Sequence, residues 1–66
     1  MLYLIRARDI HGEMFVCLEA YDSEYEEFNV VFGQRLVDGN IPYEFMEKVT
    51  EHFALFDDEP RIQFSF

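Results

Sequence analysis

Two residue types in this sequence could carry nucleophilic or metal chemistry, and neither has the spacing for it. Cys17 lies between Val16 and Leu18 in an apolar stretch, where a lone cysteine is usually a small packed hydrophobic residue and not a reactive thiol. His11 and His52 are separated in the chain and show neither Cys-x-x-Cys nor His-x-x-x-His spacing. We therefore expect no catalytic residue, no bound metal and no cofactor.

Glycine motifs that hold phosphates or expose a nucleophile are also missing. Gly12, Gly33 and Gly39 are isolated from one another, so they form neither a phosphate-binding loop nor a nucleophile elbow. Paired carboxylates can hydrolyse glycosidic bonds across a cleft. A chain of 66 residues leaves little room for a substrate pocket of roughly 300 Å³ or more. The sequence predicts that the protein is not an enzyme.

The spacing of the carboxylates is more informative, because the chain has 14 Asp and Glu against five Lys and Arg, a net charge of −9. Glu44, Glu47 and Glu51 recur at i, i+3 and i+7, so in a helix they would form a row about 10 Å long. Phosphates follow one another every ~3.4 Å along a DNA strand. A row of carboxylates this close together would suit a protein surface that is built to bind phosphates.

The candidate partner-binding residues are these glutamates, the other clustered carboxylates and two tyrosines that could anchor a contact. We expect them to share one exposed side of the molecule. They are Asp22, Glu24, Tyr25, Glu26, Glu27, Tyr43, Glu44, Glu47, Glu51, Asp57, Asp58 and Glu59. Tyr21 is a further aromatic candidate. A strongly acidic surface also keeps a phenylalanine-rich small domain soluble, so the pattern leaves both a functional and a merely solubilising role open.

The elements that must position these residues begin with a hairpin. Residues 2–8 and 14–21 read as two strands joined by a turn at Asp9–Gly12, because Gly12 can adopt a positive φ. When the two strands are paired, one face is continuous and apolar and is the predicted core face. Its members are Tyr3, Ile5, Ala7, Val16, Leu18 and Ala20. The other face mixes apolar, cysteine, arginine and glutamate side chains.

A first helix is predicted to start at Ser23, because Glu26 stands three residues later as a capping box requires. Apolar residues then recur at helical spacing and Gly39 closes the segment. They are Tyr25, Phe28, Phe32 and Leu36. Residues 28–33 are also short, β-branched and aromatic, so a strand is the alternative there.

A second helix is predicted from Pro42 to Phe56, because proline suits the first helical position and the apolar residues recur every three or four positions. Asp57–Pro60 should end it, since proline cannot continue a helix. Residues 61–66 alternate between apolar and polar side chains and predict a strand beside the hairpin.

These elements predict one α+β domain over residues 1–66: a small three-stranded antiparallel-type sheet with two helices packed on one face, in the order β-β-α-α-β. The alternative order is β-β-β-α-β, with residues 28–33 as a third strand.

Charge and cysteine content narrow the possible partners. A net charge of −9 repels nucleic acids and anionic membranes, so neither is expected to bind directly. The chain has one cysteine, no stretch of about 18 apolar residues and no signal-peptide pattern. We expect a cytoplasmic, reducing location.

The sequence therefore predicts a non-catalytic protein-binding module. The first hypothesis is a small acidic inhibitor or decoy, of the kind that phages direct against host defences or that antitoxins provide. It would occlude the nucleic-acid-binding surface of a basic partner protein. The alternative is a structural or assembly module that acts as a homodimer or as a small subunit of a larger complex. It would use the mixed sheet face through Leu2, Leu4, Phe15 and Tyr21.

Overall fold

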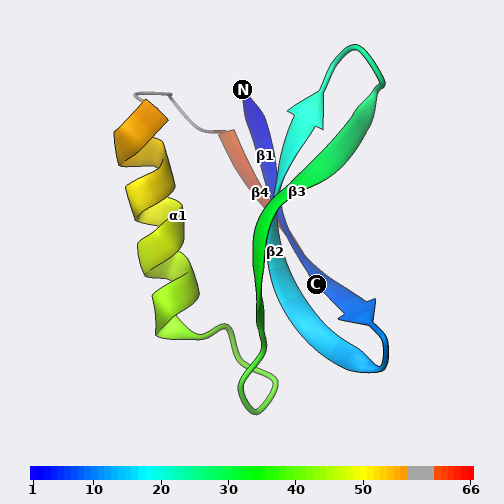
Figure 1. The fold of residues 1–66 in the computed structure, drawn as a ribbon, viewed down its shortest axis with the longest axis vertical. Helices are drawn as coiled ribbons and strands as arrows, with labels where there is room; N and C mark the ends of the chain where they lie inside the picture. Colours follow the sequence, from blue (N-terminus) through cyan, green and yellow to red (C-terminus); the bar gives the residue numbers. More distant parts are fainter. Residues whose placement is uncertain (57–60) are drawn as a thin grey trace.

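A computed structural model of the chain describes residues 1–56 and 61–66. Four strands form one sheet in the order β3-β2-β1-β4, and one helix packs against one face of it (Figure 1). In chain order the elements are β1 (Leu2–Ile10), β2 (Glu13–Asp22), β3 (Glu27–Arg35), α1 (Tyr43–Phe56) and β4 (Arg61–Ser65).

The predicted hairpin is confirmed as β1 and β2, with the predicted register. Tyr3 pairs with Ala20 and Ile5 pairs with Leu18. The turn consists of His11 and Gly12, whose φ angles are 52° and 81°, as the tightest hairpin turns require. The side chain of Asp9 closes it, because its Oδ1 accepts a hydrogen bond from the Gly12 N–H at 3.0 Å.

The first predicted helix is wrong, because its residues form the β2–β3 turn and strand β3. Asp22, and not Ser23, organises the turn: its Oδ1 accepts hydrogen bonds from the N–H groups of Glu24 at 2.9 Å and Tyr25 at 3.4 Å. An aspartate can make such a turn with its own backbone, which competes with a helix start. Glu26, the other half of the predicted capping box, has a φ of 53° and so lies outside the helical region.

A β-bulge in β3 explains how a strand could mimic helical spacing. The pairing of β2 with β3 shifts between Leu18 and Glu19, and one extra residue, Val31, is inserted on β3. Phe28 contacts Tyr21 with their ring centroids 5.2 Å apart, whereas Phe32 contacts Phe45 of α1 at 5.6 Å. A regular strand would place residues four apart on one face; the bulge turns Phe28 and Phe32 to opposite faces.

The predicted three-stranded antiparallel sheet with two helices is therefore also wrong, although the chain combines α and β elements as expected. The sheet is mixed, because β4 runs parallel to β1, with Tyr3 beside Ile62 and Ile5 beside Phe64. After β3 the chain crosses the sheet through α1 and returns at the other edge, and such a crossover produces parallel pairing. The observed order, β-β-β-α-β, is the one given above as the alternative.

The helix and the core agree with the sequence pattern. The predicted helix from Pro42 to Phe56 is observed from Tyr43. Its inward residues, Phe45 and Val49, are buried against the predicted core face of the hairpin. The buried apolar cluster consists of Tyr3, Ile5, Val16, Leu18, Phe45 and Val49. Because these inward residues are fixed, the outward face of α1 is fixed as well.

Candidate protein-binding surfaces

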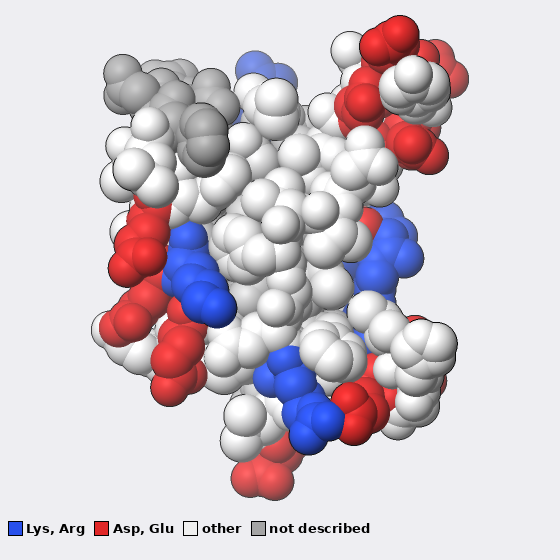
Figure 2. Space-filling view, in the orientation of Figure 1, with Lys and Arg blue, Asp and Glu red and all other residues white. Residues whose placement is uncertain are grey.

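The outward face of α1 carries the three predicted glutamates together. Phe45 and Val49 point into the core, so residues 44, 47 and 51 must project to solvent on the opposite side of a 3.6-residue helix. All three glutamates are exposed. Figure 2 shows acidic side chains as a red strip along the helix. The predicted row of carboxylates is therefore present, about 10 Å long over two helical turns.

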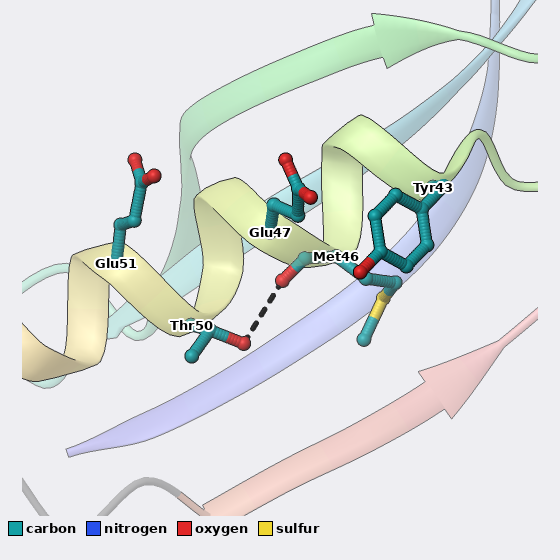
Figure 3. Close-up of a pocket in the computed structure, with 5 residues that line it drawn as sticks. All are labelled: Tyr43, Met46, Glu47, Thr50 and Glu51. Atoms are coloured by element: carbon teal, nitrogen blue, oxygen red, sulfur yellow. Dashed lines mark hydrogen bonds between the residues drawn. The ribbon is translucent and has the colours of Figure 1, made fainter.

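Two large side chains, Tyr43 and Met46, lie next to this row. Tyr43 is 75% exposed and Met46 is 36% exposed. In Figure 3 both point away from Glu47 and Glu51, toward the side of α1 where β4 lies. An open hollow of about 490 Å³ on the helix surface is lined by Tyr43, Met46, Glu47, Thr50 and Glu51. We call the surface formed by Tyr43, Glu44, Met46, Glu47 and Glu51 the acidic helix face.

The hollow is lined entirely by α1 and is therefore a surface feature. The Thr50 hydroxyl donates a hydrogen bond to the Met46 carbonyl at 3.0 Å, within the helix itself (Figure 3). Binding pockets for small molecules usually enclose most of their ligand, and an open helix surface does not.

The cations of the sheet do not compensate these glutamates. Arg6 and Arg8 pair with Glu19, and Arg35 pairs with Glu13. Among the residues that the structure describes, no glutamate of the acidic helix face takes part in a salt bridge. The only cation on α1 is Lys48, so the face keeps a net negative charge.

Hydrogen bonding in the sheet's ion pairs shifts their titration. The hydrogen bond from Arg35 lowers the pKa of the Glu13 carboxyl, and the same bond raises the pKa of Arg35. The hydrogen bond to Glu19 likewise raises the pKa of Arg8. All these shifts favour the charged forms, so these ion pairs persist at neutral pH.

The remaining predicted residues lie elsewhere. Asp22, Glu24, Tyr25, Glu26 and Glu27 form the β2–β3 turn, which lies on the far side of the sheet from α1 (Figures 1 and 2). The two acidic groups are thus on separate surfaces, contrary to the expectation of one shared side. Asp57, Asp58 and Glu59 lie outside the described residues.

Tyr21 does not offer a free anchor. It is half-buried and packs against Phe28, with their ring centroids 5.2 Å apart. Tyr25 is 69% exposed at the β2–β3 turn, so it stays accessible but distant from α1. Of the three candidate tyrosines, Tyr43 is therefore the one that stands beside the glutamate row.

The cysteine and the two histidines lie on different elements, Cys17 in β2, His11 in the β1–β2 turn and His52 in α1. Cys17 is 1% exposed, and burial raises the pKa of its thiol, which disfavours the reactive thiolate. His52 packs edge-on against Tyr3 at 5.8 Å and Phe53 at 5.5 Å, and His11 is exposed in the hairpin turn. No group of three potential metal ligands occurs within the described ranges.

One feature that the sequence did not single out is the charged centre of the uncovered sheet face. Glu19 is fully buried there, although no described element packs over that face. The Nε of Arg6 lies 3.4 Å from its Oε2, and Arg8 hydrogen-bonds its Oε1. The hairpin register already placed Arg6, Arg8 and Glu19 on this face, so the signal was present in the alternation of the strands.

No protein-family model, no curated protein and no solved structure matches the chain. Within the described part of the chain, no helix is long and apolar enough to cross a membrane.

Proposed function

We propose that this protein is a non-catalytic binding module that docks on a basic surface of a partner protein through its acidic helix face. The observation that carries the proposal is the row of Glu44, Glu47 and Glu51, exposed and unpaired within the described residues, beside the exposed ring of Tyr43. The partner surface is one that normally binds nucleic acid, so docking would occlude it. The protein then acts as an inhibitor or decoy.

Charge and rigidity both support this mode of binding. The net charge of −9 would speed the encounter with a basic surface. The glutamates stand on a helix that is held by buried Phe45 and Val49, so little backbone ordering is needed on binding. Tyr43 is a large, stiff side chain of the type that contributes most at protein interfaces.

The β2–β3 turn is the less suitable of the two acidic surfaces. Its carboxylates surround a reversal of the chain in which Glu26 has a positive φ, so they do not form a linear row. The acidic helix face offers a straight row with a regular rise of about 1.5 Å per residue. The single buried cysteine is compatible with action in a reducing cytoplasm, which we include in the proposal.

The test is affinity capture from the cytoplasm of a candidate host, followed by competition. Wild-type protein should retain a basic, nucleic-acid-binding protein at low salt and release it when duplex DNA is added, because both ligands would occupy one surface. The triple variant Glu44→Lys, Glu47→Lys, Glu51→Lys should lose that protein. High salt should release it as well, since contacts between exposed charges are screened.

A matched variant separates the helix face from overall charge. Asp22 holds the β2–β3 turn and is left intact, while Glu24→Lys and Glu27→Lys reverse two charges at that turn, away from α1. The double variant of the helix face, Glu44→Lys with Glu51→Lys, makes the same change in charge and is the direct comparison. The turn variant should retain the partner. If the helix variant binds as well as wild type, or if DNA does not displace the partner, the proposed function is wrong.

A further inference from the structure

All four arginines of the chain lie on the sheet face that α1 leaves uncovered. Arg6 and Arg8 belong to this face because the neighbouring Ile5 belongs to the core. Arg35 pairs with Phe15 on β2, and Arg61 pairs with Leu2 on β1, which places both on the same side. We call this surface the arginine face. The protein therefore carries its arginines on one outer surface and the acidic helix face on the opposite one.

The arginine face is built around a buried anchor. Glu19 is fully buried and holds Arg6 and Arg8, whose side chains remain 36% and 37% exposed. Burying a carboxylate is costly unless it is paired, and here the pairing fixes two guanidinium groups at the surface. Each guanidinium has five N–H donors, so donors remain for an external carboxylate.

The face is hollowed and mixes apolar and cationic side chains. Both hairpin ends bend away from α1 (Figure 1), and in Figure 2 cationic side chains lie between the two projecting ends. Leu4 and Cys17 in the middle are 7% and 1% exposed. Phe15 and Tyr21 nearer the ends are half-buried. A surface of this kind can receive a helix that offers carboxylates and apolar side chains.

The spacing of the arginines matches that of the glutamates on α1. Arg8, Phe15 and Arg35 are neighbours across β1, β2 and β3, so the outer two are about 10 Å apart at the usual strand separation of about 4.8 Å. Glu44 and Glu51 are separated by about 10 Å along α1. A helix that lies across the strands can thus place Glu44 near one of these arginines and Glu51 near the other.

We infer that the protein associates with itself head to tail, with the acidic helix face of one copy seated on the arginine face of the next. The occupant is a second copy because the chain itself presents the complementary charge at the matching spacing.

This contact joins two different surfaces, so a pair of copies keeps one acidic helix face and one arginine face free. Such heterologous association forms a ring if the rotation closes and an open chain if it does not. It also covers the glutamates that would engage a basic partner, so self-association and partner binding would compete. The inference concerns the protein alone and can fail while partner binding stands.

Sedimentation equilibrium of the purified protein tests the inference. The 8.0 kDa chain should show a mass average that rises with concentration, with a dissociation constant on the order of 0.1–1 mM, as a few exposed ion pairs would give. Association should be strongest near 0.15 M salt. At that ionic strength the Debye length of about 8 Å screens distant carboxylates, whereas about 1 M salt also screens the contacting pairs.

Charge reversal on each surface provides the decisive comparison. Arg35→Glu changes the arginine face at a residue that is 64% exposed, and Glu44→Lys with Glu51→Lys changes the helix face. Each variant alone should associate about tenfold more weakly or worse. When the two variants are mixed, they should form a complex, because the first keeps an intact helix face and the second keeps an intact arginine face.

The variant Glu24→Lys, Glu27→Lys is the control, because it makes the same change in charge as the helix variant at the β2–β3 turn. It should associate no more weakly than wild type does, because lysines beside the arginine face do not repel the acidic helix face. Circular dichroism establishes that all variants are folded. A wild-type mass of 8.0 kDa up to about 1 mM, or failure of the two folded variants to complement each other, overturns the inference.

Discussion

At the scale of single residues, the least expected feature is a carboxylate that is buried in a sheet face with no layer above it. Glu19 is 0% exposed, whereas its partners Arg6 and Arg8 are each more than one-third exposed. The carboxylate is thus shielded from water while both arginine side chains remain partly exposed. The contribution of this cluster to the stability of the fold therefore depends mainly on Glu19, because its carboxylate has no contact with solvent.

Replacing Glu19 should consequently destabilise the fold more than replacing an exposed glutamate of the same sheet. We expect Glu19→Ala to lower the free energy of unfolding by about 2–3 kcal/mol. This is less than the roughly 3–5 kcal/mol for a fully buried pair, because the arginines can turn to water. Glu27→Ala, at an exposed strand end, should stay within about 0.5 kcal/mol of wild type. Urea unfolding measures both, and equal effects would show that the cluster contributes nothing.

At the scale of secondary structure, the sequence correctly predicted the elements whose spacing of apolar residues fits only one type of secondary structure. The β1–β2 register followed from alternation together with the turn at Gly12, and α1 followed from apolar residues at three- and four-residue intervals. Strand β3 was predicted only as the alternative to a helix, because the bulge at Val31 gives Phe28 and Phe32 a helix-like spacing. A bulge depends on the partner strand, so the sequence of β3 alone does not reveal it.

The parallel position of β4 was missed for a similar reason. The alternation of residues 61–66 predicted a strand beside the hairpin, and β4 does pair with β1, but the predicted sheet was antiparallel. The direction of β4 follows from the crossover through α1, and with residues 27–35 assigned to a helix the predicted sheet lacked the strand from which this crossover starts. An error at one element therefore changed the predicted topology of the whole sheet.

The close approach of β2 and β3 at Gly33 gives a prediction at this scale. A Cβ at Gly33 would lie 3.0 Å from the Cys17 Sγ and 3.3 Å from the Val16 carbonyl oxygen. Cys17 is buried, so it has little freedom to move away, and we expect Gly33→Ala to cost about 1–3 kcal/mol. In a Cys17→Ala background the same change should cost less, because the sulfur is gone.

A double-mutant cycle by thermal or urea unfolding tests this coupling. Gly39→Ala is not a suitable control, since Gly39 has a φ of 75° and would be strained for a different reason. Ser23→Ala, in the exposed β2–β3 turn, is the neutral comparison. A penalty at Gly33 that is unchanged by Cys17→Ala would place the strain on the Val16 backbone instead.

At the scale of the whole molecule, the distribution of charge matters more than its total. The sequence predicted the acidic row on α1, because helical spacing alone determines which residues share a helix face. It could not predict that the second acidic group would lie apart from that row, since its location depends on the β2–β3 turn that was taken for a helix. The sequence also could not show that Arg6, Arg8 and Arg35 form ion pairs with glutamates of the sheet.

The excess of carboxylates over cations predicts how salt affects stability. Repulsion among the acidic groups opposes the compact state, while the ion pairs of the described residues are confined to Glu13 and Glu19. Raising NaCl from about 0.01 M to 0.15 M shortens the Debye length from about 30 Å to about 8 Å, which weakens the repulsion more than it weakens contacting pairs. The melting temperature should therefore rise by a few degrees, as about 1 kcal/mol gives 4–8 °C in a domain of this size. Calorimetry at micromolar concentration, where copies stay apart, measures this rise, and Glu24→Lys with Glu27→Lys should reduce it. A melting temperature that falls with salt would mean that the sheet's ion pairs, and not the repulsion between carboxylates, dominate the electrostatics of the fold.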